Sequence, residues 1–301
     1  MLTRRHLLAA FAAAPTPAAA QPRRLKVVAS FSILGDFVRE IGGGAVDAAS
    51  LVGPDRDAHI FEPSPGDARA LAAADVVVVN GLGFEGWMTR LVAASGFRGT
   101  TIIATRGVTA IRRAAPAGGR AQAGTSGDPH AWQDPLRARA MVGNIAAGLA
   151  AADPARAELY RANAAAYDAK LAALDTWVQA QLADVPPARR QVVASHDSFA
   201  YFTDRYSVAF RAPRGVSTEI EPSAADFARI IRVLRREQAR IVFLENISDP
   251  RMIEQLAREA GARIGGRLYA DALSGADGPA PTYLALMRHN VTLLREAMLA
   301  E

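Results

Sequence analysis

The sequence predicts an α/β protein of two lobes with mostly parallel sheets, joined by one long linking helix. Two observations lead to this fold class. Short apolar segments typical of buried strands alternate with helix-forming segments in both halves of the 301-residue chain. Between the halves lies a stretch of about thirty residues in good helix formers, and a helix of that length spans about 45 Å, enough to cross two domains.

The N-terminal lobe is predicted to cover residues 21–153. Its first unit is a buried strand at 25–30 and a helix at 31–41, which ends at three consecutive glycines. Further elements are a strand at 75–80, a helix at 87–95 and a strand at 100–104. Val76 to Val79 form a continuous apolar run, which is typical of strands buried on both faces of a parallel sheet. Residues 114–127 are rich in Gly, Ala and Ser and are expected to form a surface loop.

The linking helix is predicted at 154–185 and ends at Pro186-Pro187, because proline cannot continue a helix. The C-terminal lobe then covers residues 186–301. It repeats the strand and helix alternation, with strands expected at 191–195, 208–211, 241–244 and 263–268, and helices at 224–238, 250–260 and 282–299.

Residues 1–20 are predicted to be a cleaved secretory signal peptide. Arg4 and Arg5 precede an apolar stretch from Leu7 to Ala14, and the small residues Ala18 to Ala20 stand directly before Gln21. The paired arginines leave both the general secretory route and the twin-arginine route open. The apolar stretch is much shorter than the roughly 20 residues of a membrane span.

Charge and cysteine content exclude several classes of protein. The formal charge is +5, and removal of Arg4 and Arg5 leaves 33 basic and 30 acidic residues, or +3. The basic residues are scattered, so no nucleic-acid partner is expected, and the arginines at 232–240 are interpreted as a solvated helix face. The chain has no cysteine, which excludes disulfides, thiolate ligands and a lipid-anchored cysteine.

Three histidines lie in turns or directly after predicted strands. They are His59 in a turn rich in Pro and Asp, His130 in Asp128-Pro129-His130, and His196 after the strand at 191–195. Asp271 follows the strand at 263–268. Ligands in parallel α/β folds bind outside the carboxyl ends of strands, so a cleft between the lobes would gather all four side chains.

Three imidazoles and one carboxylate form a complete four-coordinate set for Zn²⁺. A catalytic zinc site normally keeps one position open, so the full set favours capture of the ion over hydrolysis. Mn²⁺ prefers more oxygen donors. Candidates for second-sphere hydrogen bonds to the imidazoles are Asp57, Glu62 and Asp197.

Other readings stay open at this point. Each histidine alone is more often a surface or capping residue, and Asp271 alone is a common turn residue. Glu221 and Glu245 compete with Asp271 as the carboxylate ligand, and His289 is expected to be structural or exposed. A secreted metallohydrolase would use Glu62 or Glu245 as a general base. A surface adhesin of the same fold would need an anchor.

With these segments in view, the chain resembles the metal-binding subunits of ABC transporters for zinc and manganese, over nearly all of its length. The motifs that carry this are Asp57-x-His59-x-Phe-Glu-Pro63, Asn80-Gly-Leu82 with Glu85, Asp128-Pro-His-Ala-Trp132, Ser195-His196 with Phe199, and Tyr269 to Leu273. The resemblance implies two (β/α) lobes on one rigid helix, and His59, His130, His196 and Asp271 as ligands.

The resemblance also implies a periplasmic, monomeric protein that captures Zn²⁺ and delivers it to a membrane permease. Manganese-binding relatives look to carry Glu at the position of His196, which favours zinc here, with Mn²⁺ as the alternative. Zinc importers of many Gram-negative bacteria carry a long loop rich in His and acidic residues before the second ligand. Residues 112–127 contain neither, so loading is expected to depend on the site alone or on a separate zinc donor protein.

Overall fold

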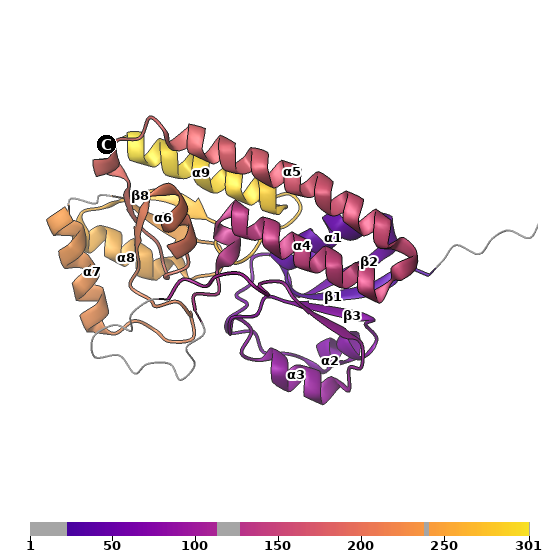
Figure 1. Cartoon of the computed structure of the whole chain (residues 1–301). Helices are drawn as coiled ribbons and strands as arrows, with labels where there is room; N and C mark the ends of the chain where they lie inside the picture. The colour runs from indigo at the N-terminus through magenta and orange to yellow at the C-terminus, as the bar shows by residue number, and fades with distance from the viewer. Residues whose placement is uncertain (1–22, 113–126, 238–240, 301) are drawn as a thin grey trace, which may run out of the picture.

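The computed structural model of the chain describes residues 23–112, 127–237 and 241–300. Two parallel sheets and their helices form two lobes side by side, with long helices along one side (Figure 1). This confirms the predicted fold class. The expected signal peptide at 1–20 and nearly all of the expected loop at 114–127 lie outside the described residues.

The N-terminal sheet has the strand order β2-β1-β3-β4, and every neighbouring pair is parallel. The two central strands are largely buried, as their apolar sequences predict. The edge strand β2 is additional to the predicted elements, because its Val-Asp-Ala-Ala-Ser-Leu-Val sequence has no continuous apolar run. The strands are β1 (Leu25–Phe31), β2 (Val46–Val52), β3 (Val76–Val79) and β4 (Thr100–Ile103).

In the described part of this half there are four helices, of which α2 and α4 are additional to the predicted ones. Both begin with a proline directly after a capping residue. The side chain of Ser64 accepts from the backbone N–H of Asp67, and that of Asp134 accepts from the N–H of Leu136. These start signals are present in the sequence. The helices are α1 (Ser32–Gly42), α2 (Pro65–Ala72), α3 (Met88–Ser95) and α4 (Pro135–Ala152).

The C-terminal sheet has the order β6-β5-β7-β8 and is also parallel throughout. In both sheets the first strand in sequence lies inside and the second lies at the edge, so the two halves share one topology. The strands are β5 (Gln191–Val193), β6 (Ala209–Arg211), β7 (Ile241–Glu245) and β8 (Arg263–Leu268). The helices are α6 (Ala200–Tyr206), which is additional to the predicted ones, α7 (Ala224–Glu237), α8 (Pro250–Ala260) and α9 (Tyr283–Leu299).

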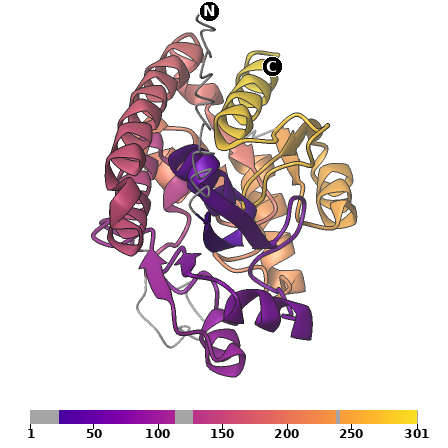
Figure 2. The same cartoon turned by 90° about the vertical axis from the view of Figure 1, so that its right-hand side faces the viewer.

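The long helix α5 (Ala157–Leu182) contacts both halves. It packs against α1 and α4 of the first half and against α9 of the second. Figure 1 shows α9 alongside α5, and Figure 2 shows α5 running along one side of the molecule. Its 26 residues extend about 39 Å. The predicted linking helix is therefore present, and its first residues form a separate turn. The short 3-10 turns are η1 (Gly43–Ala45), η2 (Ala131–Gln133), η3 (Pro154–Arg156) and η4 (Pro187–Arg189).

One buried hydrophobic cluster runs through both halves along α5. Within it, the ring of Phe37 on α1 lies 5.0 Å from that of Tyr283 on α9 and 6.0 Å from that of Tyr167 on α5. The lobes thus share a core on this side, and closely packed cores resist deformation. The residue bounds given above for the lobes stay a prediction.

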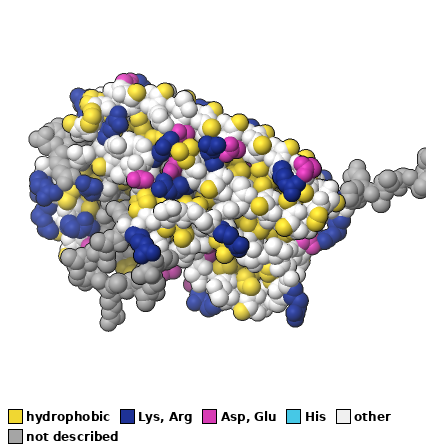
Figure 3. Space-filling view, viewed as in Figure 1, with side chains coloured by type: hydrophobic (Ala, Val, Ile, Leu, Met, Phe, Trp, Pro, Cys, Tyr) yellow, Lys and Arg dark blue, Asp and Glu magenta, His cyan; other side chains and the backbone are white. Residues whose placement is uncertain are grey.

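Arginines gather over α7 on the face drawn in Figure 3. Arg229, Arg232, Arg235 and Arg236 are exposed, and Arg229 lies 3.9 Å from Asp226. This agrees with the reading of α7 as a solvated face. A search of the described residues finds no helix with the length and apolarity of a membrane span.

Candidate metal centre

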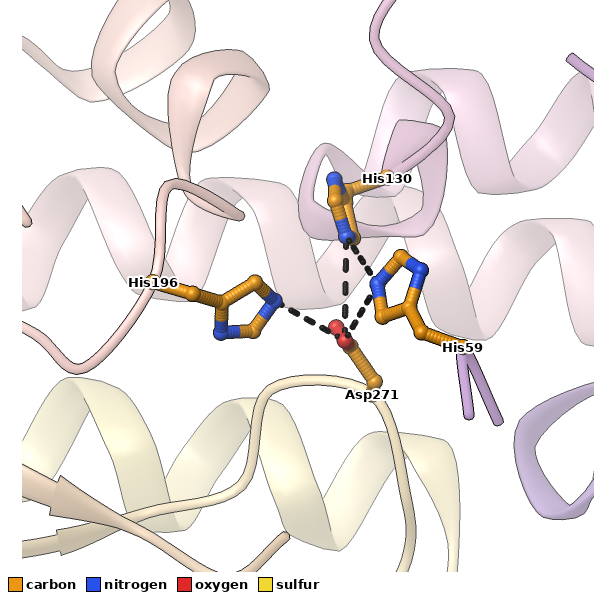
Figure 4. A group of neighbouring side chains, drawn as sticks. All are labelled: His59, His130, His196 and Asp271. Atoms are coloured by element: carbon orange, nitrogen blue, oxygen red, sulfur yellow. Dashed lines mark hydrogen bonds and ion pairs between the residues drawn. The ribbon is translucent and has the colours of Figure 1, made fainter. Parts of the chain in front are cut away.

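The four predicted ligands come together between the lobes, from four different segments (Figure 4). His59 lies in the loop after β2, and His130 directly precedes η2. His196 and Asp271 lie in the turns after β5 and β8. All four are buried, with at most 5% of each residue exposed. The fold therefore brings the four side chains together between the two halves, as predicted from their positions in the sequence.

The ligand atoms have the spacing of a small coordination shell. Oδ2 of Asp271 lies 3.0 Å from Nε2 of His196, 3.3 Å from Nε2 of His59 and 3.7 Å from Nε2 of His130. The Nε2 atoms of His59 and His130 are 3.3 Å apart, and all four atoms lie within 4.8 Å of one another. Tetrahedral zinc with bonds of about 2.0–2.1 Å separates its ligand atoms by about 3.3–3.4 Å.

Several of these atoms are buried polar groups without a hydrogen bond. Neither carboxylate oxygen of Asp271, nor Nε2 of His196, has a hydrogen-bond partner among the described residues. Buried polar atoms are nearly always paired, and their desolvation is costly otherwise. A cation bound among them would satisfy all of them at once.

Two buried carboxylates orient the imidazoles. Nδ1 of His130 lies 2.9 Å from Oδ1 of Asp128, and Nδ1 of His196 lies 2.6 Å from Oε2 of Glu245. When Nδ1–H donates to a carboxylate, the neutral ring keeps its free electron pair on Nε2, the atom that faces the centre. Glu245 also accepts from the backbone N–H groups of Ser195 and His196. It is an orienting residue and not a competing ligand.

The sequence partly missed these orienting residues. Asp128 was not among the expected acceptors, and Glu62, which was, is exposed. Asp57 accepts from the backbone N–H of His59 at 2.8 Å. Asp128 makes the same bond to the N–H of His130 at 2.9 Å. The signal that identifies both is a shared Asp-x-His spacing, in which the Asp side chain accepts from the backbone two residues on.

The other residues weighed from the sequence lie outside the centre. Glu221 is exposed and pairs with Arg214. His289 lies on α9, where its ring contacts the carbonyl oxygen of Arg267. Asp197 is partly buried, and its backbone N–H donates to Gly215.

Aromatic rings form an apolar wall beside the histidines. The Phe84 ring lies 4.6 Å from that of His59 and 5.8 Å from that of His130, and the Trp132 ring lies 5.3 Å from that of His130. Trp132 also donates to the carbonyl oxygen of Ala270, next to Asp271. Such a wall lowers the local dielectric constant, which strengthens the electrostatic interactions within it.

Burial and charge act in opposite directions on these groups. Burial lowers the pKa of His130, but the charges of Asp271 and Asp128 outweigh it and raise the pKa to about 9. The pKa of His196 is likewise raised well above its usual range, because Glu245 and Asp271 outweigh burial. Burial dominates at His59 and lowers its pKa. Burial alone would raise the pKa of Asp271, but His196 and His130 hold it well below the usual range.

The centre therefore brings three carboxylates, those of Asp128, Glu245 and Asp271, close to the imidazoles. Such a cluster of acidic groups favours positive charge in the site. The arrangement suits a closed site for a divalent ion, because all four candidate ligands are buried.

Comparison with known proteins places the chain among transporter components. The family described as "Zinc-uptake complex component A periplasmic" matches residues 27–297. The manganese-binding lipoprotein MntA of Bacillus subtilis is 32% identical over 282 residues, which are 92% of this chain and 90% of that protein. The iron-binding protein YfeA of Yersinia pestis is 31% identical over 270 residues, 89% of this chain and 85% of that protein.

A solved structure shows the same fold. It is the periplasmic zinc-binding protein TroA of Treponema pallidum, with a TM-score of 0.85 and 25% identity. The match covers 92% of this chain and 99% of that chain. The names of these three relatives refer to manganese, iron and zinc. The comparisons thus support a metal-binding protein without deciding the metal.

Proposed function

The chain belongs to the family of periplasmic zinc-uptake complex A components, and on this premise we propose that it captures Zn²⁺ and delivers it to an ABC transporter. The family comprises substrate-binding proteins of transporters and not enzymes. The observation that carries the proposal is the buried set of three imidazoles and one carboxylate.

The donor atoms favour zinc. Zn²⁺ accepts nitrogen and oxygen donors in a four-coordinate shell, whereas Mn²⁺ prefers more oxygen ligands. The two other buried carboxylates beside the imidazoles, those of Asp128 and Glu245, are engaged by imidazole Nδ1 atoms. Manganese is the second candidate, because a relative with 32% identity over 92% of the chain is named for it.

The proposed setting is the periplasm, reached through the signal peptide at 1–20, with the transporter's membrane permease as partner and the protein as a monomer. A separate zinc donor protein is part of this proposal, since residues 112–127 offer no histidine or acid to gather zinc. A hydrolytic role has little support, because a closed ligand set offers no position for an attacking water.

The test is metal content and competitive titration of the chelator-stripped protein with Zn²⁺ and Mn²⁺. We expect one zinc per chain, held more tightly than manganese. His196→Ala should weaken zinc binding by more than about a hundredfold, since it removes a ligand and the partner of Glu245. His289→Ala is the matched control, because this histidine lies on α9 outside the centre.

Three results would count against the proposal. Equal or tighter manganese binding would move the assignment to the second candidate. An equal loss of affinity in His196→Ala and His289→Ala would show that the effect does not come from this site. More than one tightly bound zinc per chain would argue against a single site and against the need for a donor protein.

A further inference from the structure

The four ligand segments are not held to the opposite lobe in the same way. On the side of α5, the contacts across the two halves are buried. Tyr201 Oη donates to the carbonyl oxygen of Asp128 at 2.5 Å, Trp132 and Gln133 donate to that of Ala270, and Tyr283 N–H donates to Asp36. The segment of His130 is thereby fixed to the segment of Asp271.

The segment of His59 is held by a different set of contacts, made by two carboxylates of its own loop. Oδ2 of Asp57 accepts from the hydroxyl of Thr218 at 2.6 Å, across the lobes. Its other oxygen, Oδ1, accepts from the backbone N–H of His59. One side chain thus links the position of a metal ligand to a residue of the opposite lobe. Thr218 is 4% exposed, so this hydrogen bond is better protected from water than those of the exposed Asp55.

The second carboxylate, Asp55, reaches the turn that carries Asp271. Its oxygens accept from Asn246 Nδ2 at 3.0 Å and from the backbone N–H of Gly275 at 3.2 Å. Asn246 Nδ2 also donates to the carbonyl oxygen of Ala272, next to Asp271. The backbone N–H of Asp55 donates to the carbonyl oxygen of Leu273.

The backbone of Asp55 indicates that these contacts hold the loop in place. Its φ is +53°, a conformation that non-glycine residues adopt at a cost, and the hydrogen bonds to the opposite lobe compensate for it. Asp55 is exposed and Asp57 is partly exposed, in contrast to the buried contacts on the side of α5. Exposed hydrogen bonds open more readily, because water replaces the lost partner.

We propose that Asp55 and Asp57, with Thr218 and Asn246 as their partners, form an interlobe clamp that positions His59 and sets the rate at which the metal leaves. The proposal rests on the proposed function. When the clamp opens, the loop of His59 separates from the other three ligand segments, and the ion loses one of its four ligands. The clamp residues act through His59 and do not touch the metal.

The experiment compares Thr218→Val, Asp55→Gly and the double variant with the wild type. Valine removes the hydroxyl at nearly constant shape, and glycine removes the carboxylate while accepting the positive φ. Thr218→Ser restores the donor. Thr176→Val is the matched control, since this hydroxyl bonds within α5, to the carbonyl oxygen of Ala172. Glu62→Gln controls for loss of a charge near His59.

The primary measurement is zinc dissociation into excess chelator by stopped flow, with association measured separately. We expect the double variant to release zinc at least about tenfold faster, with association changed by less than about threefold. Thr218→Ser and both controls should stay within about twofold of the wild type. A double variant that releases zinc at the wild-type rate, or an equal acceleration in Thr176→Val, would overturn the clamp.

A second measurement does not depend on metal. In the metal-free protein, hydrogen exchange of the His59 amide reports the bond to Asp57. We expect this amide to exchange about tenfold faster in the double variant than in the wild type and the controls. Unchanged exchange would contradict the clamp. If the wild type bound no metal, the proposed function would fail, and the exchange result would still decide whether the clamp exists.

Discussion

Glu245 shows how a residue outside the ligand set shapes this centre. It is 2% exposed, and its two oxygens accept from the ring of His196 and from two backbone N–H groups. A carboxylate in this position fixes the ring orientation and makes Nε2 a better donor to a cation. Asp128 does the same for His130.

Replacement of this carboxylate should weaken metal binding without removing a ligand. We expect Glu245→Gln to lower zinc affinity by about 10–100-fold, the usual effect of losing such a partner. The measurement is competition with a chromophoric chelator. Glu62→Gln is the control, because Glu62 is exposed and should leave the affinity within about twofold. An affinity loss of the same size in both variants would contradict the orienting role.

Metal binding should also release protons. The pKa of His130 is about 9 and that of His196 lies higher than usual, so both rings are protonated near pH 7 in the metal-free protein. His59, whose pKa is lowered, is neutral there. Because Nε2 must lose its proton to bind a metal, about two protons should leave per ion. Affinity should then rise with pH and rise less steeply above the pKa of His130.

Calorimetry at pH 7 in buffers of different ionisation enthalpy measures this release directly. The charge of the site is consistent with such a release. When a divalent ion replaces two protons, the total charge of the site, with its three carboxylates, stays the same. An observed release near zero would mean that the imidazoles are already neutral before the metal arrives.

At the scale of elements, α4 shows how closely the helices approach the sheets. A Cβ added to Gly148 would lie 2.3 Å from Cδ1 of Ile102 on β4, closer than real side chains come. Gly143, five residues earlier on the same helix, is exposed, and a Cβ there would meet nothing within 4 Å. On α4, close packing therefore requires glycine at position 148 but not at position 143.

This pair gives a prediction with its own control. Gly148→Ala should destabilise the protein by about 1–3 kcal/mol, because overpacking forces Ile102 to move. Gly143→Ala should be neutral or stabilise it by up to about 1 kcal/mol, through the better helix propensity of alanine. Thermal and urea unfolding of the metal-free variants measure both. Stabilisation by both substitutions would mean that helix propensity, and not the contact with β4, controls stability here.

At the scale of the whole molecule, the four ligands join segments from both lobes, so a bound ion links the lobes as well as the side chains. A ligand that binds only the folded state stabilises it by mass action, by about 2.7 kcal/mol when free metal is 100 times Kd. The shared core along α5 already holds the lobes together, so we expect the metal to add stability with little change in shape.

Zinc should therefore raise the Tm of the wild type, and the rise should grow with free zinc concentration. Asp271→Ala should lose most of this rise, because it removes the carboxylate ligand. His289→Ala should keep it. Differential scanning calorimetry over a zinc series, buffered with a chelator, provides the measurement. A rise of equal size in Asp271→Ala would place the stabilising ion elsewhere on the protein.

The sequence by itself determined the alternation of strands and helices, because buried parallel strands such as Val76 to Val79 are continuous apolar runs. It also determined the long helix and the four candidate ligands, since histidines are few and lie after strands or in polar turns. Elements with weak local signals, such as the edge strand β2, did not stand out. Helices α2 and α4 carried a signal in their capped Pro starts.

Only the tertiary structure decided which carboxylates surround the histidines and how the lobes meet. Glu245 lies 49 positions from His196 in sequence, and Thr218 lies 161 positions from Asp57. The first contact follows from the pairing of β5 with β7 in one sheet, and the second from how the two halves meet. No local pattern encodes either placement. The sequence could name candidate ligands because their chemistry is a property of single residues. It could not assign their partners, because a partnership depends on distance and direction in the folded chain.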